Sequence, residues 1–425
     1  MKNAFQKLFL LTFILWTPSL LSQQSRFYIY EKSDMFNVAP WFRYNKAEGL
    51  FAGVTSQFFF NENFFAEAKA GYAVAGKFPR YNAGIQKTLL SDNNEFFIRA
   101  DYYDLTETND QYVLPDWQNS ITALLFKLDY LNYYRARGPV LTFGQNWSGS
   151  YKTEIYGGLR DFYGLDNKAK LSLFDQGGEQ INGKRRFAPN PRVAEGRDYY
   201  FGINYDIDFR PSPTAFVNAW QLKGRYENSK LLHTLTNSDF SYQHIFLEFH
   251  RYQRLFTKHK MLLTLKVASY QGNTLFSADT TSSDTDGTRI LYDQFLYDLG
   301  GYGSLRGYTY REFQNGNRMM TFSWNYFFNG SFLPKTFLTK IWGIGGIFRN
   351  ADLMLFADAG HVWNANAKKS FLQPGHIGIN DIMVDAGFGL AFTEWIRCEA
   401  AFPLRKGIES KRGDYTVYLR VTPKF

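Results

Sequence analysis

Apolar and polar residues alternate along most of the chain, and the last eleven residues show this pattern most clearly. Between Tyr415 and Phe425 every second residue is apolar, and the residues between them carry hydroxyl or charged groups. Successive side chains of a β-strand point to opposite faces of the sheet. The alternation therefore predicts a strand with one apolar face and one hydrated face.

Segments with this pattern recur along the chain, and several have the length of about 9 to 11 residues that a transmembrane strand needs. Their polar faces carry charges of both signs, such as Arg43, Asp206 and Glu248. Both signs are expected in a hydrated barrel lumen, whereas the dry core of a soluble sandwich excludes them. We therefore predict an all-β fold, a sixteen-stranded antiparallel transmembrane β-barrel, with strands near residues 36–45, 50–60, 63–74, 79–88, 94–105, 139–148, 150–159, 198–208, 218–229, 240–251, 260–272, 318–328, 350–360, 383–392, 395–404 and 415–425.

The lengths of the connections agree with this strand count. Outer-membrane barrels have short periplasmic turns and longer outer loops. If the chain enters from the periplasm, the short turns, such as 61–63 and 393–394, fall on the inner side, with 329–349 as an inner connection of moderate length. The long connections then all lie on the outer side: 106–138, 160–197, 273–317 and 364–382.

One of these outer connections carries a helical pattern. From Ile121 to Leu131 the apolar residues are spaced by three, one, three and three positions. Asp116 or Asn119 could cap the start, and Gly138-Pro139 is expected to stop the helix, so we predict a helical segment within 117–137. Both a helix folded over the barrel mouth and a plug or docking surface for a partner fit this pattern.

The N-terminus has the organisation of a signal peptide. Lys2 and Lys7 precede the apolar run Leu8–Trp16, and the chain becomes polar at 22–24. This run is far shorter than the roughly 20 residues that a spanning helix needs, and no later segment has 18 consecutive apolar residues. Although a buried first helix would also fit, we expect 1–24 to be a removed signal peptide, 25–35 a short periplasmic segment and 36–425 the barrel.

The composition and net charge limit the kinds of ligand and partner that the chain can bind. The lone cysteine, Cys398, excludes an intramolecular disulfide and a cysteine-based zinc site. The formal net charge is +9, without a run of five like charges. This modest excess favours contact with anionic lipid or sugar and gives no sign of nucleic-acid binding. For an outer-membrane barrel, we expect the partners to be outer-membrane lipids and lipopolysaccharide.

No motif for catalysis or cofactor binding is present in the sequence. It contains no G-x-S-x-G, H-E-x-x-H or G-x-x-x-x-G-K-[ST] segment. His244 and His250 share strand parity but lie six residues apart, about 20 Å along a strand, which is too far for one metal ion. We therefore expect no enzyme activity, no cofactor and no metal.

The glycine-rich connection at 299–317 contains the most specific motif. Its four residues Leu305, Arg306, Gly307 and Tyr308, here called the latch motif, resemble the [VL]-R-G-[FY] motif on the sixth outer loop of the BamA/TamA outer-membrane assembly superfamily, also called bacterial surface antigen barrels. Three further segments between about 295 and 425 resemble that family: the glycine-rich approach with Gly300, Gly301 and Gly303, the F-x-D-x-G pattern at 356–360, and the last strands from 397–404 to the terminal Phe425. The terminal aromatic resembles the family's C-terminal insertion signal.

This resemblance implies a long sixth outer loop that folds into the lumen and places Arg306 beside acidic residues. The planar guanidinium matches a carboxylate, and an unpaired one is costly in a confined lumen. Asp358 shares strand parity with Phe356 and Gly360, so it can face inward and pair with Arg306. Asn325 stands where family members often carry a glutamate, and we expect it to be a second latch partner.

The resemblance also implies a function in the outer membrane of a Gram-negative bacterium. Only about 12 residues separate the expected signal peptide from the first strand, so we expect a member that lacks the family's N-terminal polypeptide-transport-associated domains. The resemblance implies a role in outer-membrane biogenesis or in protein or lipid transport. For that role, a separate periplasmic or lipoprotein partner could replace the missing domains. The alternatives are a structural or surface-antigen barrel without transport activity and, less favoured, a passive pore.

Two prolines bear on the closure of the expected barrel. Pro40 lies in the first strand and Pro423 in the last, and proline cannot donate a hydrogen bond to a sheet. We interpret this as a weak seam between the first and last strands. The alternative is that Pro423 lies beyond the paired region and Pro40 at the lipid-exposed margin of its strand.

Overall fold

The fold was analysed in a computed structural model of the chain. The structure describes residues 35–90, 94–147, 149–174, 177–181, 183–191, 193–212, 215–256, 259–272, 276–277, 290–291, 293–328, 333–341, 351–365, 378–391 and 396–421. The expected signal peptide 1–24, Pro423 and Phe425 lie outside these residues.

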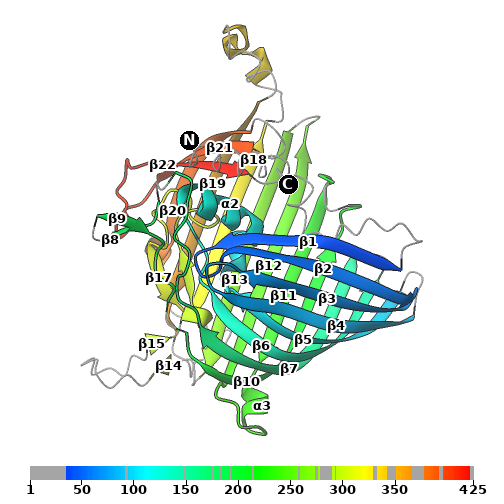
Figure 1. Cartoon of the computed structure of the whole chain (residues 1–425). Coiled ribbons are helices and arrows are strands. Elements are labelled where there is room, and N and C mark those ends of the chain that lie inside the picture. Colours follow the sequence, from blue (N-terminus) through cyan, green and yellow to red (C-terminus); the bar gives the residue numbers. More distant parts are fainter. Residues whose placement is uncertain are drawn as a thin grey trace, which may run out of the picture. The chain divides into compact units, whose positions relative to one another are not determined.

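Sixteen strands form one antiparallel sheet, as predicted, and they follow one another in chain order (Figure 1). Their bounds are β1 (Phe36–Asn45), β2 (Gly49–Asn61), β3 (Phe64–Ala73), β4 (Phe78–Leu90), β5 (Asn94–Glu107), β6 (Tyr134–Trp147), β7 (Tyr151–Gly164), β10 (Gly196–Asp208), β11 (Ala219–Asn228), β12 (Tyr242–Leu255), β13 (His259–Gly272), β18 (Arg318–Phe327), β19 (Asp352–Trp363), β20 (Met383–Ala391), β21 (Ile396–Pro403) and β22 (Thr416–Val421).

The connections contain three small two-stranded sheets and short helices. The small sheets pair β8 with β9, β14 with β15, and β16 with β17. The bounds of these elements are β8 (Glu179–Ile181), β9 (Lys184–Arg186), β14 (Phe276–Ser277), β15 (Ile290–Leu291), β16 (Tyr297–Leu299), β17 (Phe313–Gly316), α2 (Asp116–Phe126), α3 (Lys230–His233), η1 (Asp110–Tyr112), η2 (Asp293–Phe295), η3 (Leu333–Lys335), η4 (Phe337–Lys340) and η5 (Ile379–Asp381). Among the described residues, no helix combines the length and apolar character that crossing a membrane requires.

The chain divides into two compact units. The first comprises 1–88, 99–139 and 163–191, and its described part contains β1 to β3, α2 and the β8–β9 hairpin. The second comprises 89–98, 140–162 and 192–425, and it contains β10 to β22. The latch motif and its expected partners all belong to the second unit.

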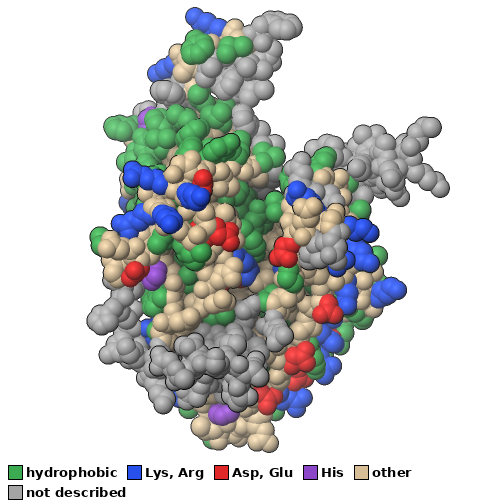
Figure 2. Space-filling view, turned by 90° about the vertical axis from the view of Figure 1, so that its left-hand side faces the viewer, with side chains coloured by type: hydrophobic (Ala, Val, Ile, Leu, Met, Phe, Trp, Pro, Cys, Tyr) green, Lys and Arg blue, Asp and Glu red, His purple; other side chains and the backbone are tan. Residues whose placement is uncertain are grey.

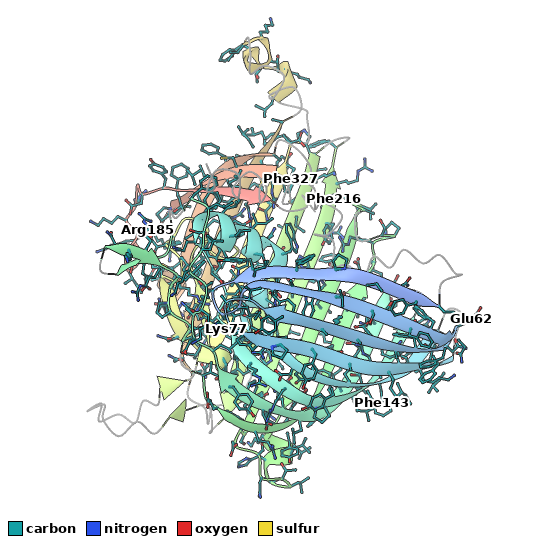
Figure 3. All side chains as sticks on the ribbon, viewed as in Figure 1. Glu62, Lys77, Phe143, Arg185, Phe216 and Phe327 are labelled. Carbon is teal, nitrogen blue, oxygen red and sulfur yellow. The ribbon has the colours of Figure 1, made fainter. Side chains whose placement is uncertain are left out.

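The two faces of the strands differ as the alternation predicts. In β1 the side chains of Phe36 and Val38 are 55% and 57% exposed, and Phe143 of β6 is similarly exposed (Figure 3). Figure 2 shows hydrophobic side chains gathered over part of one face of the molecule. The opposite face holds buried ion pairs, such as Arg80 with Asp104 at 3.3 Å. Large exposed apolar residues on most strands of the sheet are typical of a surface that contacts lipid.

The helix in the connection after β5 is shorter than predicted. It ends at Phe126, because Lys127 adopts the left-handed conformation with φ of 61°. Gly138-Pro139, which we expected to stop the helix, lies inside β6, and that part of the prediction is wrong. The helix has no side-chain cap at its start, so neither Asp116 nor Asn119 caps it.

Asn119 explains the early end of this helix. Its Nδ2 donates a hydrogen bond to Asp129 Oδ1 at 2.7 Å, and its Oδ1 accepts one from the Tyr130 amide at 2.7 Å. These bonds turn the segment after α2 back against the helix. The apolar residue Leu131 is fully buried in this turn, which is why its spacing looked helical in the sequence.

Candidate functional site

The latch motif lies in a closed loop that two short strands hold together. Residues 300–312, here called the latch loop, connect β16 to β17, which pair through Tyr297 with Gly316 and Leu299 with Phe313. Gly300 has a φ of +117°, and a Cβ there would lie 2.4 Å from the Thr309 carbonyl oxygen. Only glycine fits this turn without displacing the backbone.

The four residues of the latch motif are buried. Leu305 and Tyr308 are fully buried, and Arg306 is 4% exposed. The Tyr308 hydroxyl donates to the carbonyl oxygens of Val384 at 3.0 Å and Arg405 at 3.2 Å. The motif is therefore held against β20 and the connection that follows β21.

Gly307 makes the closest approach between the latch loop and the sheet. A Cβ at this position would lie 2.6 Å from the Asp385 Cβ and 2.8 Å from the Phe402 carbonyl carbon. Any side chain would therefore push the loop away from β20 and β21.

Arg306 and Asp358 form a bidentate ion pair. Arg306 Nε donates to Asp358 Oδ2 at 2.6 Å, and Nη2 donates to Asp358 Oδ1 at 2.8 Å. Arg306 Nη2 also donates to Asn325 Oδ1 at 3.0 Å, and the guanidinium lies 3.6 Å from the centre of the Phe356 ring. The structure thus brings both expected latch partners to Arg306.

The charge state of Arg306 follows from its surroundings. Burial lowers the pKa of a guanidinium, but the carboxylates of Asp358 and Glu399 outweigh this effect and raise the pKa of Arg306 above its usual value. The side chain therefore stays cationic, and its two carboxylate partners stabilise that charge.

Glu399 of β21 is a partner that the sequence analysis did not assign. Its Oε2 accepts hydrogen bonds from Arg306 Nη1 at 3.2 Å and from Arg420 Nη1 at 3.3 Å. Arg397 lies 3.6 Å away on the same strand. Glu399 therefore joins the latch loop to β22 as well as to β21. The alternation of apolar and polar residues puts Glu399 on the polar face of its strand, and this was the one feature of the sequence that pointed to it.

Asp385 was also missed. It is fully buried and lies directly across from Asp358 in the register of β19 and β20. Two buried carboxyl groups thus lie side by side. Of these two described groups, Asp358 forms an ion pair with Arg306 and Asp385 does not.

A second anchor of the latch loop is Glu312. Its carboxylate accepts hydrogen bonds from the backbone amides of Thr309 at 3.0 Å, Glu409 at 2.8 Å and Ser410 at 2.9 Å. Burial raises the pKa of Glu312, but these bonds and the one from the Ser410 hydroxyl outweigh it and lower the pKa below its usual value. Glu312 thus ties the latch loop to the connection between β21 and β22.

The latch loop also contacts the last described strand directly. The Tyr302 ring packs edge-on against Tyr418 of β22 at a centroid distance of 5.6 Å. The Arg420 guanidinium lies 4.3 Å from the centre of the same Tyr302 ring. Together with Glu399, these contacts connect the loop to β22 on two sides.

The remaining predicted site residues are two glycines of the latch loop, two prolines and the C-terminal phenylalanine. Gly301 and Gly303 lie in the latch loop, with φ of +82° and +93°. Pro40 lies inside β1, where it faces Val54 of β2. Pro423 and Phe425 are outside the described residues, so the expected seam and insertion signal stay predictions. Within the described ranges, no group of three or more His, Cys, Asp or Glu residues could hold a metal ion.

Comparison with known proteins places this arrangement in a family. Residues 200–411 match the model of the Omp85 superfamily domain. The chain also resembles the crystal structure of BamA from Haemophilus ducreyi lacking POTRA domains 1–3, with a TM-score of 0.51 and 14% identity over 91% of this chain and 70% of that one. No curated protein sequence matched the chain.

Two CdiB structures resemble the chain more distantly. CdiB from Acinetobacter baumannii aligns with a TM-score of 0.36 and 14% identity over 91% of this chain and 59% of that one. CdiB from Escherichia coli aligns with a TM-score of 0.37 and 12% identity over 92% of this chain and 63% of that one. The chain thus spans less than two thirds of either protein.

The sheet, the exposed apolar face and the latch motif define an outer-membrane protein of the assembly and translocation type. The chain belongs to the Omp85 superfamily, whose domain covers residues 200–411. The predicted family and the predicted location in the outer membrane of Gram-negative bacteria are confirmed.

Proposed function

We propose that this protein acts in outer-membrane biogenesis by inserting or moving protein or lipid, without enzyme activity. The observation that carries the proposal is the Arg306 cluster, in which one loop is bonded to Asp358 of β19 and Glu399 of β21. Through Tyr302 and Arg420 the same loop contacts β22, the last strand in the sheet order. The loop is therefore in a position to control the edge of the sheet.

The latch gives this edge two states. While Arg306 is paired, β21, β22 and the connection between them are bonded to one loop. When the pair is broken, β22 is held by its hydrogen bonds within the sheet and no longer by the loop. In the proposed function, β22 is released so that a client chain or lipid can pass, and the first strand, with Pro40, forms the other side of the seam.

A separate periplasmic or lipoprotein partner completes the proposal. We infer that residues 36–425 form the membrane barrel after removal of the signal peptide 1–24. In this proposal, delivery of clients is assigned to that second protein.

Depletion of the protein tests this function. We expect levels of outer-membrane proteins and lipopolysaccharide to fall, and expression of the natural chain to restore them. Arg306→Ala is expected to restore them poorly, whereas Arg412→Ala, at an exposed position after β21, should restore them fully. Unchanged levels after depletion would refute the proposal and favour a structural or surface-antigen barrel.

Large and steady conductance of the natural protein in planar bilayers would favour the passive pore instead. The latch predicts rare openings that become frequent in Arg306→Ala. Equal conductance of the two proteins would remove the latch from the proposed function.

A further inference from the structure

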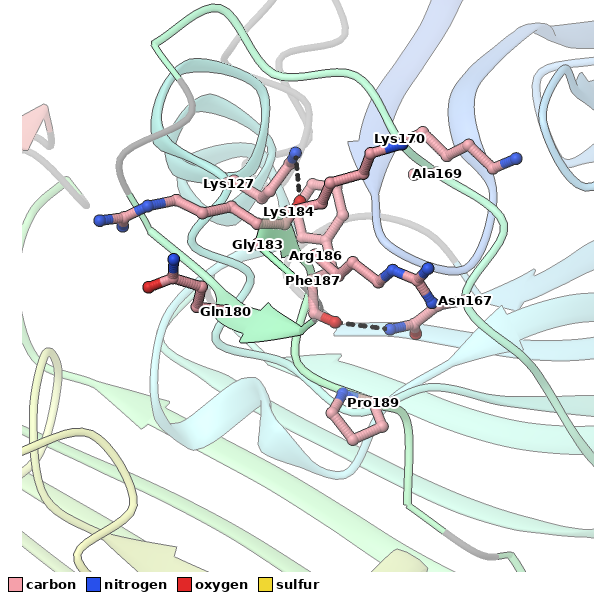
Figure 4. A pocket seen from close by; sticks show the side chains of 11 residues that line it. Lys127, Asn167, Ala169, Lys170, Gln180, Gly183, Lys184, Arg186, Phe187 and Pro189 are labelled. Carbon is pink, nitrogen blue, oxygen red and sulfur yellow. Dashed lines mark hydrogen bonds between the residues drawn. The ribbon is translucent and has the colours of Figure 1, made fainter.

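A cationic cavity lies in the first unit. It has a volume of about 920 Å³, and its lining includes Lys127, Lys170, Lys184, Arg185 and Arg186 (Figure 4). None of the described residues that line it is acidic. The cavity lies within the size range of about 300–1,000 Å³ that is typical of small-molecule sites.

The end of α2 supports one wall of this cavity. The last carbonyl groups of the helix accept hydrogen bonds from the segment that leads to the β8–β9 hairpin: Leu124 from Leu173 at 2.8 Å, Leu125 from Phe174 at 2.8 Å and Phe126 from Gly177 at 2.6 Å. The last carbonyl groups of any helix have no hydrogen-bond partner within the helix itself. Here the backbone amides of this segment bond to them in place of water. The wall is therefore a bonded structure.

Lys127 connects this wall to the hairpin. Its ammonium group donates to the Arg185 carbonyl oxygen at 3.0 Å and lies 5.9 Å from the centre of the Phe187 ring. Phe187 is buried in a cluster with Tyr44, Ala123 and the lining residue Ala169. The floor of the cavity is thus apolar and packed, while its rim is cationic.

The rim charges have few carboxylates to neutralise them. Lys170, Lys184, Arg185 and Arg186 are exposed and form no ion pair with another described residue. Among the described residues of these connections, Glu179 lies across the hairpin from Arg186, and Asp166 already pairs with Lys168 at 3.0 Å. Gathering like charges at one cavity is unfavourable unless an anion binds there.

Asn167 adds a hydrogen-bond acceptor to this cationic site. Its Nδ2 donates to the carbonyl oxygens of Phe187 and Ala188, at 3.3 and 2.7 Å, which fixes the orientation of the amide. Its Oδ1 is buried and accepts no hydrogen bond from the described residues. A buried acceptor without a donor is costly, and a hydroxyl group would satisfy it.

We propose that this cavity binds a phosphorylated saccharide. The arginine and lysine side chains suit phosphate, because guanidinium groups bind its oxygens in pairs and ammonium groups neutralise its charge. Asn167 suits a sugar hydroxyl, and the apolar floor suits the face of a sugar ring. Both walls come from connections that we predict to lie on the outer side, so the sugar is either free at the cell surface or the headgroup of a membrane glycolipid.

Two probes distinguish these sources. Glucose 1,6-bisphosphate, with glucose as its control, is titrated calorimetrically into the full chain in detergent micelles. Lipid A in nanodiscs, with dephosphorylated lipid A as its control, tests the membrane source by co-sedimentation with the same protein. Binding of the phosphorylated probes is expected to weaken as salt increases, because the contacts with the exposed rim are screened.

A charge-matched pair of variants tests the site itself. The triple variant Lys170→Gln, Lys184→Gln, Arg185→Gln is expected to bind roughly tenfold more weakly. The control Lys230→Gln, Lys411→Gln, Arg412→Gln removes the same charges from exposed positions outside the cavity and should bind as the natural chain does. All substituted side chains are exposed, and heat-modified migration in SDS gels checks that each variant is folded.

The outcomes show whether the cavity binds a phosphorylated sugar, and whether that sugar is free or part of a glycolipid. A selective loss in the triple variant with the bisphosphate supports a free sugar, and a selective loss only in nanodiscs supports a glycolipid headgroup. Absence of binding by either probe, or equal loss in both variants, would overturn the proposal. This inference does not depend on the assembly function.

Discussion

Breaking the pair between Arg306 and Asp358 is expected to open the latch loop. Asp358→Asn is the sharper perturbation, because it keeps the size of the side chain and removes the charge that both Nε and Nη2 contact. Among the described residues, Arg306 then keeps Glu399 as its one ionic partner, and Glu399 is shared with Arg420.

The expected magnitude follows from the burial of both partners. Their side chains are 4% and 1% exposed, so solvent cannot replace the lost contacts while the loop stays closed. Removing one partner of a buried ion pair costs about 3–5 kcal/mol. We take the lower end, about 3 kcal/mol, because Asn325 and Glu399 still contact the guanidinium.

Trypsin provides an assay for loop opening. Arg311 lies in the latch loop and is held by Asp298 at 2.6 Å, so cleavage after it requires the loop to open. When opening is fast and reversible, the cleavage rate follows the population of the open state. A loss of about 3 kcal/mol therefore predicts cleavage on the order of a hundredfold faster, measured by mass spectrometry of the fragment that ends at Arg311.

Controls separate loop opening from general unfolding. Glu62→Gln, in an exposed turn between β2 and β3 (Figure 3), should leave the cleavage rate unchanged. Arg306→Lys, which keeps the charge but loses the planar fork, should give an intermediate rate. If Asp358→Asn is cleaved at the rate of the natural chain, the ion pair does not hold the loop and the reasoning fails.

Three further predictions concern the same loop. Asp385→Asn should leave the trypsin cleavage rate unchanged, since it replaces a buried carboxyl group beside Asp358 that forms no ion pair with Arg306; acceleration equal to that in Asp358→Asn would contradict this assignment. Glu312 has a lowered pKa in the folded protein, so its stabilisation is present above the ordinary glutamate pKa of about 4.3 and is lost as pH falls through the folded value. The amide exchange rate across 405–412, corrected for its intrinsic pH dependence, should therefore rise at low pH in the natural chain. In Glu312→Gln the rate should be high at every pH and depend less on pH. Identical pH profiles of the two proteins would show that Glu312 does not anchor the loop. Gly307→Ala should destabilise the closed loop by about 1–3 kcal/mol through overpacking, measured as faster cleavage after Arg311, whereas Gly157→Ala, whose Cβ would meet its nearest atom at an ordinary 3.4 Å, should have little effect.

The alternation of residues determined the strands, because it reflects a local property of the backbone. In β1, Phe36 and Val38 face outward simply because side chains alternate in any extended strand. The same local character explains why the start of α2 was found and its end was not. The helix ends where Asn119 bonds to Asp129 and Tyr130, and apolar spacing carries no record of these bonds.

The latch motif could be found in the sequence because it consists of four consecutive residues. Asp358 could be predicted as a partner of Arg306 because strand parity turns it toward the lumen. The other contacts of the loop depend on the tertiary structure. Glu399 reaches Arg306 across 93 positions of sequence, and Glu312 reaches Ser410 across 98. The sequence shows that these residues are polar and which way a strand would turn them, but many polar residues share that property. Only the pairing of strands and the closure of the loop select which carboxylate meets which cation, because these interactions act over a few ångströms between segments that the fold alone brings together.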